Sequence, residues 1–213
     1  MHSVSLVHST PDGDNLVSYM ARVSNPKNQS NSTTSPRLIA YLIKHNHWSP
    51  FEMVSMCVEI ETTRSVAAQI LRHRSFSFQE MSQRYAEVTS SPAMPHYRRQ
   101  DATNRQSSID DLDDYTQQDF QLKTQQVFDL ATGLYNELIA AGVAKETARD
   151  VLPLSTPTKL YMHGTLRSWI HYVQLREGNG TQLEHQKVAL GVKELIAKAF
   201  PQCFAAIWDT SCI

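Results

Sequence analysis

The alternation in residues 52–61, EMVSMCVEIE, constrains the fold most. Large apolar side chains at positions 54, 56, 58 and 60 alternate with smaller or polar ones. Because successive side chains of a strand point to opposite faces, this period of two predicts a strand with one strongly apolar face. A helix is predicted from about Thr63, with an apolar stripe at positions 66, 67, 70 and 71.

Further elements are predicted on both sides of this strand and helix. We expect strands at 3–8 and 158–164, and helices at 14–25, 37–46, 115–141, 145–153, 166–176 and 182–200. Thr165 is predicted to cap the helix at 166, and Thr181 with Glu184 to form a capping box for the last helix. Residues 91–114 lack periodicity and are expected to be a functional lid or an interface loop, not a domain linker. The fold class is α+β: one domain over 1–213, with a mixed or antiparallel sheet, a long-helix bundle and no Rossmann unit.

Composition excludes several classes of protein. The 213 residues include 20 basic and 21 acidic side chains, a net charge of -1, which argues against a general nucleic-acid-binding protein. No apolar run is long enough to cross a membrane, and MHSVSLVHST has no secretory features, so we expect a cytoplasmic protein. Three widely spaced cysteines suggest neither a disulfide framework nor a cysteine metal site.

The strongest chemical signal is the stretch LRHRSFSFQEMSQRY, residues 71–85. It places Arg72, His73 and Arg74 at a predicted helix end, followed by serines and Arg84. Guanidinium groups bind phosphate through two parallel hydrogen bonds, and serine hydroxyls complete the oxygen shell. The residue types therefore favour an anion site for a phosphate ester, although an exposed basic turn at a helix C-terminus explains the same pattern.

A second set of cations lies further along the chain, at Arg149, Arg167, His171 and Arg176. Arg167 and His171 share one face of their helix, which alone is more typical of a solvated surface. His45 and His47 have a metal-ligand spacing without a third ligand nearby, so no metal site is expected. No glycine-rich nucleotide motif is present, and any bound nucleotide must be held by arginines and loops.

The segment RHRSFSFQEMS resembles the signature of the flavin-dependent thymidylate synthase family, which is Arg-His-Arg, seven residues, then Ser. Three more segments resemble family elements in the same order: HNHWSPFE, ARDVLPLS and LRSWIHYVQLREGNGTQLEH. The resemblance implies conversion of dUMP to dTMP. The one-carbon unit would come from 5,10-methylenetetrahydrofolate, the hydride from reduced FAD, and NADPH would re-reduce the flavin. It also implies an α+β homotetramer with active sites between subunits.

The resemblance also implies a set of site residues. The expected dUMP contacts are Gln69, Arg72, Glu80, Met81, Ser82, Gln83, Arg84, Arg149 and Arg176. The expected FAD contacts are Ser49, Glu52, Arg72, His73, Arg74, Gln79, Glu80, Thr165, Arg167 and His171. Arg176 is the implied catalytic residue, because a guanidinium at the polar edge of uracil stabilises the negative charge that develops there.

Other features of the sequence bear on this expectation. No cysteine has an Arg or His within three residues, so a route without a cysteine nucleophile is the consistent one. The chain departs from the common family pattern at His171, Asn179, Gly180 and Leu183. The competing hypothesis is a non-catalytic nucleotide- or RNA-binding module that uses the same arginines, which predicts a steep salt dependence of binding.

Overall fold

An antiparallel sheet of four strands carries the fold. The computed structural model describes residues 2–178 and 180–209. The strand order is β1 (Ser3–Ser9), β2 (Ser55–Thr63), β6 (Pro157–Thr165) and β3 (Ser77–Glu80). The side chains at 54, 56, 58 and 60 are all fully buried, as the alternation predicts. The α+β prediction with an antiparallel sheet is confirmed, and all neighbouring strands of this sheet run antiparallel.

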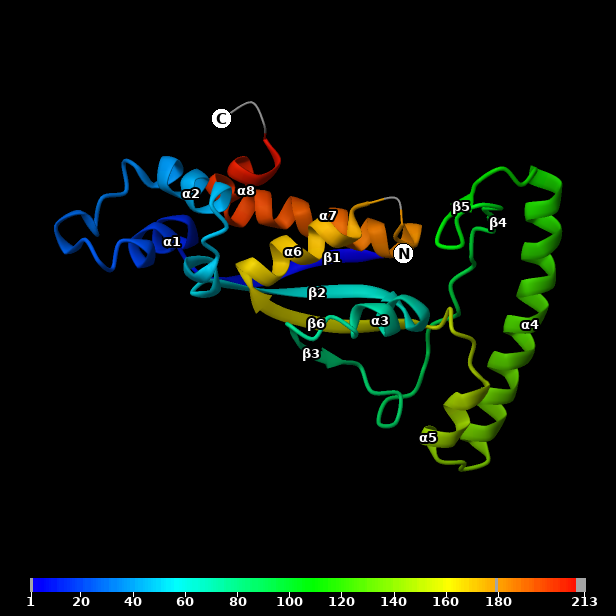
Figure 1. The fold of residues 1–213 in the computed structure, drawn as a ribbon. Coiled ribbons are helices and arrows are strands. Elements are labelled where there is room, and N and C mark those ends of the chain that lie inside the picture. The colour runs from blue at the N-terminus through cyan, green and yellow to red at the C-terminus, as the bar shows by residue number, and fades with distance from the viewer. Residues whose placement is uncertain (1, 179, 210–213) are drawn as a thin grey trace.

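Helices cover the apolar face of the sheet. Figure 1 shows α6 (Leu166–Arg176) and α7 (Leu183–Ala199) lying along this face, followed by α8 (Pro201–Trp208). At one end of the sheet lie α1 (Gly13–Ala21), α2 (Ser35–Lys44) and the short helices η1 (Pro26–Asn28) and η2 (Ser49–Glu52). The polar face includes Lys159, which pairs with Glu59 at 3.1 Å and with Glu61 at 3.2 Å. Within the described residues, no helix combines the length and apolar character needed to span a bilayer.

The short helix α3 (Arg64–Ile70) follows β2 directly, and α6 follows β6 in the same way. The two strands are paired from Ser55 with Thr165 to Thr63 with Pro157. Because they run in opposite directions, the two helices begin at opposite ends of the sheet. Their C-terminal ends are thereby brought toward each other. His73 follows the end of α3 and Arg176 is the last residue of α6, whereas Arg167 lies at the start of α6.

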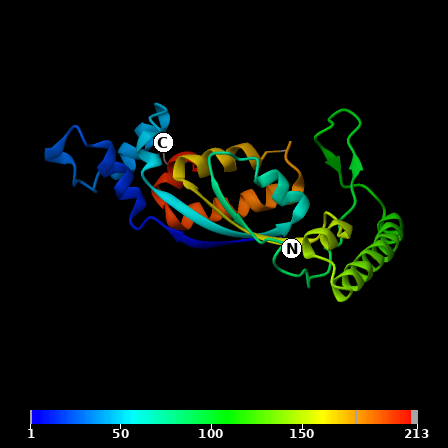
Figure 2. The ribbon, with the colours of Figure 1, turned by 90° about the horizontal axis from the view of Figure 1, so that it is seen from below.

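A long helix, α4 (Asp114–Ala140), stands apart from the sheet together with the hairpin of β4 (Arg99–Gln100) and β5 (Ser108–Ile109). Figure 2 shows the same separation from below. After Gly142, whose φ of 80° suits glycine, come α5 (Lys145–Ala148) and η3 (Arg149–Val151). The expected loop at 91–114 therefore contains a small hairpin of its own.

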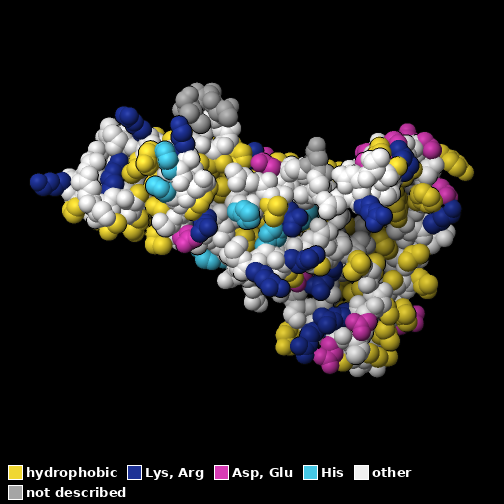
Figure 3. Space-filling model, viewed as in Figure 1, with side chains coloured by type: hydrophobic (Ala, Val, Ile, Leu, Met, Phe, Trp, Pro, Cys, Tyr) yellow, Lys and Arg dark blue, Asp and Glu magenta, His cyan; other side chains and the backbone are white. Residues whose placement is uncertain are grey.

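The apolar stripe of α4 is only partly covered. Phe128 and Tyr135 are buried against the chain. Phe120, Val127 and Leu134, spaced by seven residues, are 42%, 60% and 42% exposed, and Leu130 is 75% exposed. Figure 3 shows hydrophobic side chains spread over the part of the surface where α4 lies. The sequence predicts this helix correctly, and the structure adds that the described residues cover one apolar face only in part, for example where Tyr97 packs against Phe120.

Candidate active site

The converging ends of α3 and α6 place His73 against Arg176. The Nε of Arg176 donates a hydrogen bond to Nε2 of His73 at 3.0 Å. The His73 ring also contacts the edge of Tyr172, with ring centroids 4.9 Å apart. Burial, and then the charges of Arg176 and His171, lower the pKa of His73 to about 4. His73 is therefore neutral at pH 7, with Nε2 as the acceptor and the proton on Nδ1.

A second histidine lies behind this pair. His185 is buried, its Nε2 lies 3.1 Å from the hydroxyl of Tyr172, and its Nδ1 lies 3.3 Å from Oε1 of Gln69. Burial, followed by the charges of Arg176 and His73, lowers the pKa of His185 to about 3. Sequence reasoning named Gln69 but missed Tyr172 and His185. The spacing of Tyr172 four residues before Arg176, which puts both on one helix face, was the available signal.

A cavity of about 400 Å³ opens beside α6. It is lined by Trp48, Glu52, Ser75, Arg167, Ser168, Ile170, His171 and Gln174. Arg167 forms an ion pair with Glu52 across it, so three residues expected to contact FAD lie together here. Ser49 belongs to the same short helix as Glu52. Trp48, Ser75 and Gln174 were not among the site residues expected from the sequence.

Thr165 is the N-cap residue of α6. Its hydroxyl accepts a hydrogen bond from the backbone N–H of Ser168 at 3.3 Å and caps α6, as predicted. The predicted capping box at α7 is wrong. Gln182 occupies the N-cap position without a side-chain hydrogen bond to the backbone N–H groups of the helix, and the Glu184 carboxylate binds Arg98 instead.

The end of β3 and the loop after it hold a second group of site candidates. Glu80 accepts hydrogen bonds from Arg64 at 2.5 Å and from Thr158 at 2.9 Å. Arg84 pairs with Glu146 at 3.2 Å. Arg64 was missed by sequence reasoning, because nothing about the first residue of a helix indicates a partner sixteen positions later.

Arg149 lies in the same region as the second group. Its Nε donates to the backbone oxygen of Glu146 at 3.2 Å. Arg149, Arg64 and Gln83 line a cavity of about 280 Å³. Gln83 is buried, and its Nε2 has no hydrogen-bond partner among the described residues. A buried donor without a partner is costly, so this cavity suits a ligand with acceptor oxygens.

The remaining candidates lie on the surface between these groups. Arg72, Arg74 and Gln79 are exposed, and Figure 3 shows basic and histidine side chains gathered over this part of the molecule. The backbone N–H of Met81 donates to Lys159, and the hydroxyl of Ser82 accepts from the backbone of Arg84 at 3.3 Å. Asn179, one of the departures from the family pattern, lies outside the described residues.

Two properties of this arrangement decide what it can bind. The hydrogen bonds and ion pairs of residues 2–178 and 180–209 do not connect the His73 and Arg176 group with the Arg84 and Arg149 group. In the same part of the chain, no carboxylate forms an ion pair with Arg72, Arg74, Arg149 or Arg176. Uncompensated guanidinium groups in accessible positions are suited to an anionic ligand.

The cysteines are poor nucleophiles in these surroundings. Cys57 is half-buried, and burial raises the pKa of its thiol. Cys203 is buried, and burial, with Asp14 nearby, raises its pKa further. Cys212 lies outside the described residues. Among the residues described, no three His, Cys, Asp or Glu side chains are grouped so that they could hold a metal ion.

Comparison with known proteins assigns the chain to a family. The family model described as "Thymidylate synthase complementing protein" matches residues 5–202. A "Flavin-dependent thymidylate synthase" of Synechocystis sp. is 47% identical over 198 residues, which are 93% of this chain and 90% of that protein. A "Probable flavin-dependent thymidylate synthase" of Paramecium bursaria Chlorella virus 1 is 46% identical over 95% of this chain and 94% of the viral protein.

Solved structures agree with this assignment. A UMP/dUMP methylase from Streptomyces cacaoi, crystallised with 5-Br dUMP, superposes with a TM-score of 0.86 at 28% identity, over 97% of this chain and 94% of the methylase. The structure with 5-Br UMP gives a TM-score of 0.85 at 29% identity, over 97% and 93%. Together with the matched family model and the two relatives, these likenesses show that the chain belongs to the flavin-dependent thymidylate synthase family.

Proposed function

We propose that this protein is a cytoplasmic flavin-dependent thymidylate synthase. It converts dUMP to dTMP with 5,10-methylenetetrahydrofolate as the one-carbon donor, reduced FAD as the hydride source and NADPH as the reductant of the flavin. The observation that carries the proposal is the state of Arg176, which His73 holds through Nε and which no described carboxylate neutralises. Its terminal amino groups can therefore donate hydrogen bonds to an oxygen of the pyrimidine ring.

The residues around the larger cavity fit a flavin nucleotide. Arg167 and His171 offer donors for phosphate oxygens, while Trp48 and Ile170 give apolar surface for a ring system. Glu52 already fixes the position of Arg167 by their ion pair. FAD, when bound, supplies the hydride that completes the methyl group. The proposed holders are Ser49, Glu52, Arg72, His73, Arg74, Gln79, Glu80, Thr165, Arg167 and His171.

The proposed dUMP residues divide by chemistry. Arg84 and Arg149 neutralise the phosphate, and the partnerless Nε2 of buried Gln83 donates to an acceptor oxygen of the same ligand. Arg176 lies against the uracil ring, where its planar fork stabilises negative charge as C5 becomes nucleophilic. Gln69, Arg72, Glu80, Met81 and Ser82 complete the proposed set. The neutral His73 keeps Arg176 oriented without competing for its charge.

A homotetramer with shared sites accounts for the division into two groups. Since no hydrogen bond or ion pair of the described residues joins the two groups, we infer that one subunit supplies the Arg176 group and a neighbour supplies the Arg149 group. The exposed apolar face of α4, with Phe120, Val127 and Leu134, gives such an assembly a surface to bury. Both inferences agree with the wide dispersal of arginines along the sequence.

Visible absorbance and tritium release test the proposal. The purified protein should show flavin absorbance, and in this flavin-loaded form it should release tritium from dUMP labelled at C5 when the folate donor and NADPH are added. A protein that takes up no FAD and releases no tritium is not this enzyme. Binding to polynucleotides with a steep salt dependence, in place of turnover, would favour the binding-module hypothesis.

Mixing two variants tests the shared site. Arg176→Ala and Arg149→Ala each remove one half of every site, so each alone should be inactive at low dUMP concentration. If the halves come from different subunits, random co-assembly restores about a quarter of the sites, because both intact halves then meet. If activity does not return after co-refolding, both halves belong to one subunit. Unmixed Arg176→Ala protein treated in the same way is the control.

A further inference from the structure

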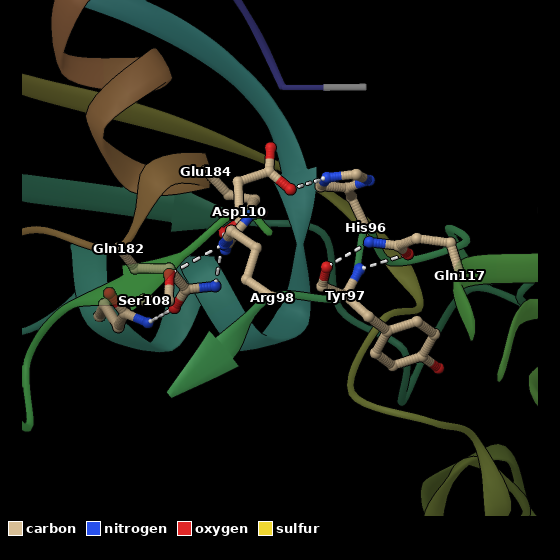
Figure 4. A network of polar contacts seen from close by, with 9 residues as sticks. His96, Tyr97, Arg98, Ser108, Asp110, Gln117, Gln182 and Glu184 are labelled. Atoms are coloured by element: carbon tan, nitrogen blue, oxygen red, sulfur yellow. Dashed lines mark hydrogen bonds and ion pairs between the residues drawn. The ribbon is translucent and has the colours of Figure 1, made fainter. Parts of the chain in front are cut away.

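The segment 91–114 is attached to the start of α7 by Arg98. Its two terminal amino groups donate to the two carboxylate oxygens of Glu184 at 2.7 and 2.9 Å, and its Nε donates to the Ser108 hydroxyl at 2.9 Å. Figure 4 shows Arg98 between Ser108 of the hairpin and Glu184 of α7. The two paired side chains are only 12% and 21% exposed. A bidentate, largely buried pair is far better ordered than a surface ion pair.

Glu184 is an obligate acceptor. Although burial opposes ionisation, hydrogen bonds from Arg98 and Gln182 lower the pKa of Glu184 to about 2. At neutral pH its carboxylate can accept hydrogen bonds but cannot donate one. Gln182 therefore presents its amide nitrogen to Glu184, at 2.8 Å, and must use its Oε1 as an acceptor on the other side.

This constraint passes from Gln182 into the proposed nucleotide site. Oε1 of Gln182 accepts from Nε2 of Gln69 at 2.6 Å, so Oε1 of Gln69 faces the opposite way. There it accepts from Nδ1 of His185 at 3.3 Å, which leaves Nε2 of His185 to accept from the Tyr172 hydroxyl at 3.1 Å. Each donor and acceptor follows from the previous one, beginning at the Glu184 carboxylate.

We propose that Arg98 and Glu184 are positioning residues that fix the side-chain amide of Gln69 for nucleotide binding. The inference rests on the proposed function, which makes Gln69 a dUMP contact. With its Oε1 and one N–H engaged, Gln69 keeps a single N–H for an acceptor oxygen of the nucleotide. The segment 91–114 thus acts on the site through hydrogen bonds and not by contact with the substrate.

The test variant is Glu184→Gln, which keeps the size of the side chain and removes the obligate acceptor. Its matched control is Asp111→Asn, because Asp111 pairs with Arg99 of the same hairpin at 2.5 Å and has no link to Gln69. Nuclear magnetic resonance of the Gln69 side-chain amide, assigned by its loss in Gln69→Ala, reports the orientation without any ligand. The signals should shift and broaden in Glu184→Gln and stay unchanged in Asp111→Asn. Unchanged signals in Glu184→Gln overturn the positioning role.

The affinity for dUMP tests whether the positioning of Gln69 matters for nucleotide binding. In the flavin-loaded enzyme, Glu184→Gln should raise the Kd for dUMP about tenfold, with flavin absorbance retained. In a Gln69→Ala background the same change should have little further effect, since residues that act through one another are non-additive. Additive losses contradict a route through Gln69.

The test still gives a result if Glu184→Gln does not fold or if the wild-type protein does not bind dUMP. If Glu184→Gln does not fold, Arg98→Lys keeps the charge but loses the paired donors, and it should also disturb the Gln69 amide signals. Unchanged Gln69 signals in that variant count against the inference. If the wild-type protein fails to bind dUMP, the proposed function is wrong. The side-chain amide signals still test the positioning of Gln69, because they are measured without a ligand.

Discussion

Nε of Arg176 donates to Nε2 of His73 across 3.0 Å, although 103 residues separate the two in the chain. This bond needs a neutral imidazole, and burial of His73 provides one. The guanidinium is thereby oriented while its full charge remains available. A carboxylate in the place of His73 would hold Arg176 as well but would cancel the charge that the proposed reaction uses.

Arg176→Ala should lower kcat by about 10²–10³-fold, because it removes a donor at the place where negative charge develops in the transition state. Flavin absorbance of the purified variant should remain, since the larger cavity is lined by other residues. Tritium release from C5-labelled dUMP measures the effect. Arg37→Ala, on the exposed surface of α2, serves as the control and should keep full activity. Normal turnover in Arg176→Ala would remove Arg176 from the chemistry.

Arg149→Ala should act mainly on affinity. Loss of one charge-assisted contact to phosphate weakens the Kd for dUMP by about 10- to 100-fold, while kcat at saturating dUMP falls much less. Calorimetric titration of the flavin-loaded enzyme gives the Kd directly. An unchanged Kd would mean that Arg149 does not contact the phosphate.

Stability should fall as the pH drops below about 6.5. Burial holds the pKa of His73 at about 4 and that of His185 at about 3, both below the value of 6.5 for an exposed histidine. Between these values the unfolded chain binds more protons than the native protein, so the free energy of unfolding decreases as pH decreases. Urea midpoints measured from pH 7 to pH 4 follow the loss.

The variant His73→Gln isolates the contribution of one histidine to this pH dependence. Its Oε1 can still accept from Arg176, but it has no titratable group in this pH range. The slope of the urea midpoint against pH should therefore become shallower than in the wild type. An equal slope in both proteins would place the titration elsewhere.

Val127→Glu on α4 should dissociate the proposed oligomer, because it puts a charge into an exposed apolar face that the proposed assembly would bury. The matched control is Leu122→Glu. Leu122 is 69% exposed, compared with 60% for Val127, but it lies about 140° around the helix at 3.6 residues per turn. Sedimentation velocity should show smaller species for Val127→Glu. Leu122→Glu should sediment like the wild type. Identical sedimentation of both would mean that this face is not an interface.

Local sequence patterns predicted the elements that build the core. The strand at 55–63 follows from its alternation, and the cap of α6 follows from Thr165, because both depend on neighbours in the chain. The α7 capping box failed for a physical reason: Glu184 gains more from Arg98, 86 residues away, than from its own helix terminus. No pattern within ten residues of Glu184 contains that information.

The site was accessible from the sequence only in part. The basic residues predicted an anion site. Their spacing in the sequence could not show that they would lie in two separate groups. Nor could the helical periodicity of Val127 and Leu134 show whether they face the core of the chain or another molecule, because both surfaces select the same residue types. The place of His185 in the site could not be predicted, because it depends on contacts with Gln69 and Tyr172, which are distant in the sequence.

The opposite starting points of α3 and α6 have an electrostatic consequence. Both helices direct their carbonyl ends toward His73 and Arg176, so the backbone field at this place attracts cations and repels anions. Many nucleotide-binding proteins use the amino end of a helix to hold phosphate, and that device is reversed here. At His73 and Arg176, the attraction for a negatively charged group must therefore come from side chains, and raising the ionic strength should weaken it.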